Sequence, residues 1–293
     1  MDLRYLFLAL LISISCDSQD PISQDNQKEV GKFIDDWTFE VFLDSESNNS
    51  KAIFRLWIPE GITPKHILVL TPGGFGNGIG LVNHKEWQDY ARKEELALLG
   101  VYVTSATSTS VNALMTGLKN ISIKRGVEYV NDLPFLLRGF SSGGRFSHVF
   151  SSSYPKKTAA FANIKGLIFY DGQISKEIPE LIIVGEKESS ERKKQLKNVF
   201  LSSRKANKIC CFAIEPNEGH SIGNSDQLVR DFFSSVLKKR LTLEVSMSEK
   251  DLFLGNIETF EYSPFSGYLA NKEQASCLIN EDFAVKWVDF MKK

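Results

Sequence analysis

The chain has almost no net charge and no stretch in which basic side chains dominate. It contains 35 Lys and Arg against 36 Asp and Glu, for a formal net charge of -1. Proteins that bind nucleic acid usually carry a basic patch, often interleaved with aromatic side chains, and none is visible in this sequence. The charge pattern therefore argues against nucleic acid as a partner.

Metal ligands and phosphate-binding motifs are also scarce. The chain has four cysteines and four histidines, and they form no group with metal-site spacing. It contains neither G-x-x-x-x-G-K-[ST] nor a G-x-G-x-x-G that opens a helix and is followed by a ribose-binding acid. We therefore expect no metal and no other cofactor.

The apolar run over residues 6–16 is too short for a membrane span, which needs about 20 residues. It ends in small residues and Cys16, which is typical of a secretory signal segment over 1–16. Cys16 after Ser15 resembles a bacterial lipoprotein cleavage site, in which this cysteine is lipidated. We expect an extracytoplasmic protein, anchored to a bacterial membrane only through that lipid. A cleaved ordinary signal, giving a secreted or periplasmic protein, is the alternative.

The polar residues 17–32 suit a flexible tether.

The other three cysteines favour a buried role. Cys210 and Cys211 are adjacent in a predicted strand, so their side chains point to opposite faces of the sheet. One of them could form a disulfide with Cys277 in an oxidising compartment. The spacing of the cysteines leaves this pairing open.

Apolar runs predict eight strands, separated by helical patterns. The first two, 37–43 and 52–58, alternate apolar and polar residues around a turn-rich segment, which indicates a hairpin. The later runs are continuously apolar, as in buried parallel strands. They are 66–71, 101–105, 135–139, 167–170, 181–184 and 209–214, and the helical patterns cover about 85–99, 110–130, 142–153, 189–206 and 225–240. This alternation predicts an α/β fold with a mostly parallel eight-stranded sheet and helices on both faces.

The length and composition suit one large domain. Hydrophobic residues make up 42% of the chain, and we expect 33–240 to form the α/β domain. Residues 241–293 follow the last predicted helix and contain several aromatic side chains. We expect them to pack on the domain edge; a cap that shapes a substrate cleft is the alternative.

The motif Gly139-Phe140-Ser141-Ser142-Gly143 carries most of the functional information. It is a G-x-S-x-G sequence between a predicted strand and a predicted helix. That arrangement holds a nucleophilic serine on a sharp strand-to-helix turn, with its oxygen above the sheet. The glycines on either side remove Cβ atoms that would clash in so tight a turn. The following helix directs its first N–H groups toward a developing oxyanion.

A glycine-rich loop, residues 71–78, follows the predicted strand 66–71 and can supply a second oxyanion donor. Its glycines allow the backbone to approach a substrate closely. We assign the donors to the backbone N–H of Ser142 and of Gly74 or Phe75. A plain flexible loop is the alternative.

A serine nucleophile on this architecture needs a histidine and an acid, in the chain order Ser, Asp/Glu, His. Of the four histidines, only His220 lies in a loop between a late predicted strand and a helix. Glu188 follows strand 181–184 and can orient the imidazole. Glu186 and Asp171, which follow the same and the preceding predicted strand, are the alternative acids. A solvated charged turn would also explain the two glutamates.

These segments, with 70–74, 87–91, 100–103 and 215–220, resemble the α/β-hydrolase fold family. Within it, the chain is similar to esterases and poly(3-hydroxybutyrate)-depolymerase-like serine hydrolases over roughly residues 37 to 240. The resemblance implies a Ser141 nucleophile, a His220 base and an oxyanion loop near Gly74. The family acid is usually Asp, and here Glu188 stands at the matching place.

The leading hypothesis is therefore a serine hydrolase that cleaves small-molecule or polymeric carboxylic esters through an acyl-enzyme on Ser141. A peptidase or amidase with the same residues is one alternative. A surface lipoprotein that uses the fold for binding, without catalysis, is the other.

Overall fold

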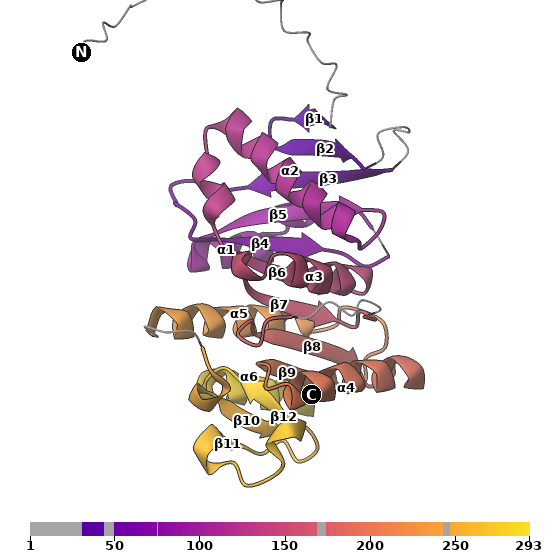
Figure 1. Cartoon of the computed structure of the whole chain (residues 1–293), viewed down its shortest axis with the longest axis vertical. Helices are drawn as coiled ribbons and strands as arrows, with labels where there is room; N and C mark the ends of the chain where they lie inside the picture. The colour runs from indigo at the N-terminus through magenta and orange to yellow at the C-terminus, as the bar shows by residue number, and fades with distance from the viewer. Residues whose placement is uncertain (1–30, 44–49, 75, 169–173, 243–246) are drawn as a thin grey trace, which may run out of the picture.

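The computed structural model describes residues 31–43, 50–74, 76–168, 174–242 and 247–293. The signal segment, Cys16 and most of the predicted tether lie outside these ranges. The described residues form a nine-stranded main sheet with helices packed against it (Figure 1). Its strands are β1 (Gly31–Asp35), β2 (Thr38–Phe42), β3 (Lys51–Trp57), β4 (His66–Thr71), β5 (Leu96–Val103), β6 (Phe135–Phe140), β7 (Thr158–Ile164), β8 (Glu180–Gly185) and β9 (Cys210–Glu215).

The strand order across the sheet is β1-β2-β3-β5-β4-β6-β7-β8-β9. Six neighbouring strands are parallel: β5, β4, β6, β7, β8 and β9. Strands β1, β2 and β3 extend the sheet by antiparallel pairing. The predicted mostly parallel sheet is confirmed. The described sheet has one strand more than the eight predicted, because β1 begins at Gly31, inside the expected tether.

Helices cover both faces of the sheet, as predicted. In Figure 1, α2, α3 and α4 lie in front of the sheet and α5 lies behind it. Local caps explain where two of them begin: the hydroxyl of Thr107 accepts the Ser110 N–H before α2, and Ser189 accepts the Arg192 N–H before α4. The helices are α1 (Lys85–Glu94), α2 (Ser108–Arg125), α3 (Ser142–Ser153), α4 (Ser190–Lys205), α5 (Ser225–Thr242) and α6 (Glu281–Lys292).

The predicted strand 167–170 is wrong over the residues that the structure describes. Gly166, Leu167 and Ile168 form no strand, and 169–170 lie outside the described ranges. The strand is β7 instead, which begins at Thr158, ends at Ile164 and is fully buried. Its alanines give a weak β signal in the sequence. Helix α3 packs closely against β7: if Gly144 in α3 carried a Cβ, that atom would lie 2.0 Å from Oδ1 of Asn163 in β7. Small residues therefore suit this part of the strand.

The predicted boundary between helix 85–99 and strand 101–105 is also wrong. Helix α1 ends at Glu94 because Glu95 adopts a left-handed conformation, with φ of 55°. Strand β5 starts at once, at Leu96. A short apolar run can continue a helix or begin a strand, and only the pairing of β5 with β3 and β4 decides between them.

The C-terminal residues pack against the edge of the main sheet at β9. They form a small sheet of β10 (Phe253–Asn256), β11 (Tyr262–Pro264) and β12 (Ala275–Leu278), followed by α6. The Ser276 hydroxyl and the Trp287 indole N–H both bond to the backbone of Phe212 in β9. This packing satisfies polar backbone groups at the edge strand, which would otherwise be open to pairing with another chain.

The three described cysteines are free thiols, and all are buried. Burial raises the pKa of Cys210 and Cys211 well above its usual range and that of Cys277 to about 11. A thiol of this kind is a poor nucleophile, because the thiolate is the reactive form. These cysteines therefore act as apolar core residues.

Glu180 should make the stability of the protein depend on pH. Its side chain is buried, one carboxylate oxygen has no hydrogen-bond partner, and burial raises its pKa to about 7, against the opposing effects of the Lys208 charge and a hydrogen bond with Cys210. The folded state then holds a proton that the unfolded chain has released above about pH 4.5. The free energy of unfolding should therefore fall by about 3 kcal/mol as the pH rises from there to 7.

Urea unfolding at pH 5 and pH 8 measures this fall in stability. Glu180→Gln should remove most of the fall, because the amide does not titrate. Glu191→Gln, at an exposed position on α4, should keep it. An equal fall in Glu180→Gln and in the unchanged protein would contradict the prediction.

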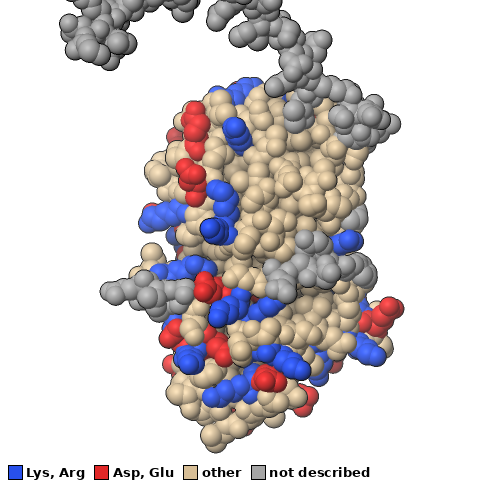
Figure 2. All heavy atoms as spheres, viewed as in Figure 1, with Lys and Arg blue, Asp and Glu red and all other residues tan. Residues whose placement is uncertain are grey.

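The surface carries charges of both signs. On the face shown in Figure 2, Lys and Arg are interspersed with Asp and Glu around the lower half of the molecule, and the area over α2 and α3 is mostly uncharged. Across the described ranges, none of the helices combines the length and the apolarity that crossing a membrane requires.

Candidate active site

Ser141 lies on a strained turn between β6 and α3. Its backbone has φ of 52° and ψ of -117°, which a residue with a side chain rarely adopts. Glycines make the turn possible: a Cβ on Gly139 would lie 1.9 Å from the carbonyl oxygen of Gly143. A Cβ on Gly143 would lie 2.5 Å from the carbonyl oxygen of Thr71 at the end of β4. The geometry is that of a nucleophile elbow, with the serine at the carboxyl end of β6.

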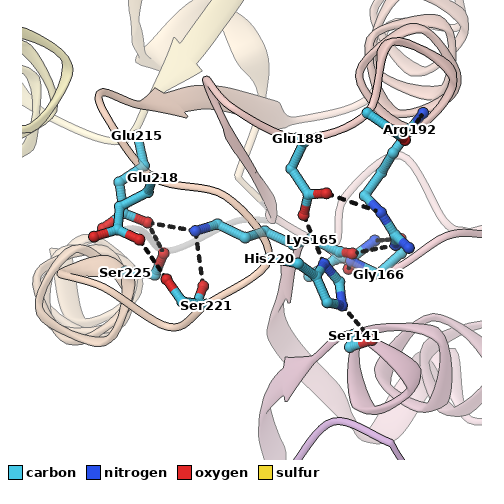
Figure 3. Close-up of polar contacts among 12 residues, drawn as sticks. Ser141, Lys165, Gly166, Glu188, Arg192, Glu215, Glu218, His220, Ser221 and Ser225 are labelled. Atoms are coloured by element: carbon cyan, nitrogen blue, oxygen red, sulfur yellow. Dashed lines mark hydrogen bonds and ion pairs between the residues drawn. The ribbon is translucent and has the colours of Figure 1, made fainter.

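Hydrogen bonds connect the side chains of Ser141, His220 and Glu188, which we call the Ser–His–Glu chain (Figure 3). The distance from His220 Nε2 to Ser141 Oγ is 2.9 Å, and that from His220 Nδ1 to Glu188 Oε1 is 2.6 Å. The three residues follow β6, β9 and β8. They meet because the carboxyl ends of parallel strands lie along the same edge of the sheet.

A guanidinium holds the second oxygen of the glutamate. Arg192 Nε lies 3.2 Å from Glu188 Oε2, and its Nη1 donates to the carbonyl of Lys165 at 2.8 Å. The Glu188 side chain is 5% exposed, so the carboxylate is held away from water between an imidazole and a guanidinium. This arrangement restricts the rotation of Glu188 and directs one oxygen at His220 Nδ1.

The alternative acids occupy other places. Glu186 Oε2 accepts the backbone N–H of Asn217 at 2.8 Å, so this side chain braces the turn after β9. Asp171 lies outside the described residues. Of the acids that the structure describes, Glu188 is the one bonded to His220.

The other three histidines lie on other elements. Burial lowers the pKa of His66 to about 4, and this residue begins β4 at the opposite end of that strand from the site. His84 precedes α1, and His148 is buried within α3 with its ring beside Phe161.

The glycine-rich loop after β4 lies beside the serine. A Cβ on Gly73 would come within 3.0 Å of the Ser141 Cβ. Gly74 adopts φ of 61°, and a Cβ built on it meets nothing within 4 Å, so the loop opens toward free space at this residue. Ser142 is the first residue of α3 and directly follows Ser141, so its backbone lies at the N-terminal end of the helix beside the serine. Phe75 lies outside the described residues.

The serine and the histidine are accessible from solvent. The His220 side chain is 39% exposed, and its ring lies 5.2 Å from the Phe140 ring, centre to centre, at an angle of 34°. This contact supports one face of the imidazole and leaves its Nε2 edge directed at Ser141. A substrate carbonyl can therefore approach the serine oxygen from outside.

Within the described parts of the chain, His, Cys, Asp and Glu side chains form no group of three or more suited to a metal ion.

Two residues beside the site, Arg192 and Lys165, were not predicted from the sequence. Arg192 was detectable, since it stands four residues after Glu188 at the start of a predicted helix, where such pairs face each other. Lys165 follows the strand that was misplaced, so nothing in the sequence marked it as a buried residue beside the site.

No family model matches the chain, and no curated protein matches its sequence. Among solved structures, the fold is similar to that of a ferulic acid esterase, with a TM-score of 0.51 and 11% identity over 69% of this chain and 97% of that chain. For an alpha/beta hydrolase enzyme from a Medee basin deep-sea metagenome library, the TM-score is 0.47 and the sequence identity 8%, over 65% of this chain and 85% of that chain. For a thermostable esterase, the TM-score is 0.46 and the sequence identity 17%, over 63% of this chain and 55% of that chain. At these identities the likeness describes the fold alone, an α/β fold with a mostly parallel central sheet and helices on both faces.

Proposed function

We propose that the protein is a serine hydrolase that cleaves carboxylic esters through an acyl-enzyme on Ser141. The observation that carries this proposal is the Ser–His–Glu chain, with distances of 2.9 Å and 2.6 Å at the carboxyl ends of three strands. A fold used only for binding has no need of a strained serine bonded to an imidazole that a carboxylate orients. The ferulic acid esterase similar in fold is consistent with ester chemistry.

In the proposed mechanism, Ser141 Oγ attacks the ester carbonyl while His220 Nε2 accepts the hydroxyl proton. Glu188 bonds to Nδ1–H, which keeps Nε2 free to accept and stabilises the imidazolium. The backbone N–H groups of Ser142 and of Gly74 or Phe75 bind the oxyanion, and each such donor is worth about 10²–10³ in rate. His220 then donates its proton to the leaving alcohol, and water resolves the acyl-enzyme by the same steps.

The substrate is a small-molecule or polymeric ester. Amide cleavage uses the same groups, so the peptidase or amidase alternative differs in the leaving group alone. Ester cleavage is the proposal because an alcohol leaves more readily than an amine and needs less assistance from a general acid.

Two measurements test the proposal. Fluorophosphonate should add once to the purified protein, as read by intact mass, with the adduct on Ser141 by peptide mapping. Among substrates with the same acyl group, p-nitrophenyl butyrate should be hydrolysed faster than the p-nitroanilide. Faster anilide hydrolysis would favour an amidase. A folded protein with neither adduct nor turnover would favour the non-catalytic lipoprotein.

We further propose that the protein is extracytoplasmic and anchored through a lipid on Cys16. The support is the apolar run and the cysteine in residues 1–16. Mass spectrometry of protein isolated from bacterial membranes tests it. A mature N-terminus at Cys16 with two or three acyl chains is expected, and an unmodified N-terminus elsewhere would refute it.

A further inference from the structure

The turn that follows β7 lies beside the site, where Lys165 is drawn next to His220 (Figure 3). The backbone N–H of Ser141 donates to the carbonyl of Ile164, the last residue of β7, at 2.8 Å. Lys165, the next residue, extends its side chain to the carbonyl of Ser221 at 2.7 Å. Ser221 directly follows His220, so this hydrogen bond holds the backbone that carries the imidazole.

The same residue also supports the acid. The carbonyl of Lys165 accepts Arg192 Nη1 at 2.8 Å, and the guanidinium binds Glu188 through its Nε. The backbone N–H of Lys165 donates to the carbonyl of Ile183 in β8, which fixes the turn against the strand that leads to Glu188. Ile164 and Lys165 together therefore connect the segments of all three members of the Ser–His–Glu chain, and Lys165 itself connects those of His220 and Glu188.

A buried ion pair fixes the lysine. Its Nζ lies 2.8 Å from Glu215 Oε2, and the two side chains are 0% and 2% exposed. The Ser225 hydroxyl donates to the same carboxylate at 2.8 Å, and the Asn224 N–H donates to its other oxygen. Glu215 and Ser225 stand at the two ends of the segment that contains His220, so the carboxylate closes this loop.

Stability alone does not explain such a pair. Removing two charges from water is costly, and apolar residues of similar volume often stabilise a protein as much or more. Lys165 also adopts φ of 58°, a conformation that costs a residue with a side chain additional free energy. What the pair supplies is fixed geometry: a rigid charge-assisted link between the β7 turn and the His220 loop.

We propose that Lys165, through its buried pair with Glu215, is a positioning residue that sets the place of His220 between Ser141 and Glu188. This inference rests on the proposed function. Lys165 touches no reacting atom, and it acts through the backbone of Ser221 and through Arg192.

The test replaces both members of the pair, Lys165→Met with Glu215→Gln, so that no buried charge is left alone. We expect kcat for p-nitrophenyl butyrate to fall by about 10²-fold, because a displacement of about 1 Å can cost that much. KM should change little, since neither residue reaches the substrate. The rate of fluorophosphonate labelling should fall in the same ratio.

The matched control removes a comparable pair far from the site. Arg204 is 1% exposed, and its Nη2 lies 3.0 Å from Glu249 Oε2, where the pair holds the C-terminal residues. Arg204→Met with Glu249→Gln should lower the melting temperature and leave kcat of the folded enzyme within twofold. If both double variants lower kcat equally, the effect is general loosening and the proposal is wrong.

A second measurement is independent of turnover. The chain has four histidines, so ¹⁵N-histidine labelling gives a simple spectrum, and the Nδ1–H proton bonded to Glu188 should appear far downfield. His220→Gln identifies this signal. In the Lys165/Glu215 variant it should move upfield or broaden. An unchanged signal with kcat within twofold of the unchanged protein would overturn the proposal.

If the Lys165/Glu215 variant does not fold, the Arg192→Met variant tests the positioning role in its place. The Arg192 side chain is 21% exposed, so its loss should spare the fold while it disconnects Lys165 from Glu188. A shifted Nδ1–H signal and a loss in kcat of about tenfold support the positioning role, and no change in either contradicts it. Failure of the proposed function looks different: the unchanged protein then shows no labelling or turnover, while its Nδ1–H signal still reports where His220 is held.

Discussion

Ser141→Ala is expected to lower kcat for ester hydrolysis by about 10⁶-fold and to abolish fluorophosphonate labelling. Without its Oγ, no acyl-enzyme can form, and the imidazole at 2.9 Å has no hydroxyl proton to accept. Alanine has a Cβ like serine, so the strained turn at φ of 52° meets the same steric demands. The fold should therefore remain, with a melting temperature close to that of the unchanged protein.

Ser152→Ala provides the control. Ser152 lies on the same helix, α3, and its hydroxyl bonds to the carbonyl of Val149 away from the site. This variant should label and hydrolyse esters like the unchanged protein. Turnover in Ser141→Ala within tenfold of the unchanged protein would show that hydrolysis does not pass through Ser141.

Glu188→Gln is expected to lower kcat by about 10⁴-fold with little change in KM. The amide has nearly the shape of the carboxylate, but its NH₂ group can donate to His220 Nδ1. That bond stabilises the tautomer with its proton on Nε2, which cannot accept the proton of Ser141. The loss of charge also removes the carboxylate that stabilises the imidazolium at 2.6 Å.

Glu186→Gln is the matched control, because Glu186 stands two residues earlier and bonds to the backbone of Asn217. We expect its kcat to stay within about threefold of the unchanged value, with a small loss of stability from the turn. The reverse order, with Glu186→Gln inactive and Glu188→Gln active, would assign the acid to the other glutamate. Both variants should be assayed at several pH values, so that a shifted optimum is not taken for a loss.

Much of the fold was predictable because its signals are local. The strand 66–71 coincides with β4, and helix 142–153 with α3, since each is a strong apolar pattern bounded by turn residues. The prediction of a strand over 167–170 was wrong because three of the seven residues of β7 are alanines, whose β preference is weak. That strand exists because β6 and β8 need a partner between them, which is a property of the whole sheet.

The sequence by itself determined the turn at Ser141, since only glycines fit two residues before and after it, and it determined the place of His220 after a late strand. Tertiary structure alone decided which glutamate meets the imidazole. Glu186 and Glu188 have the same chemistry and stand two residues apart, and the path of the turn after β8 separates their directions. It also decided the burial of Lys165 against Glu215, fifty residues away. A local pattern carries no information on such a contact, because chain folding alone brings the two charges together.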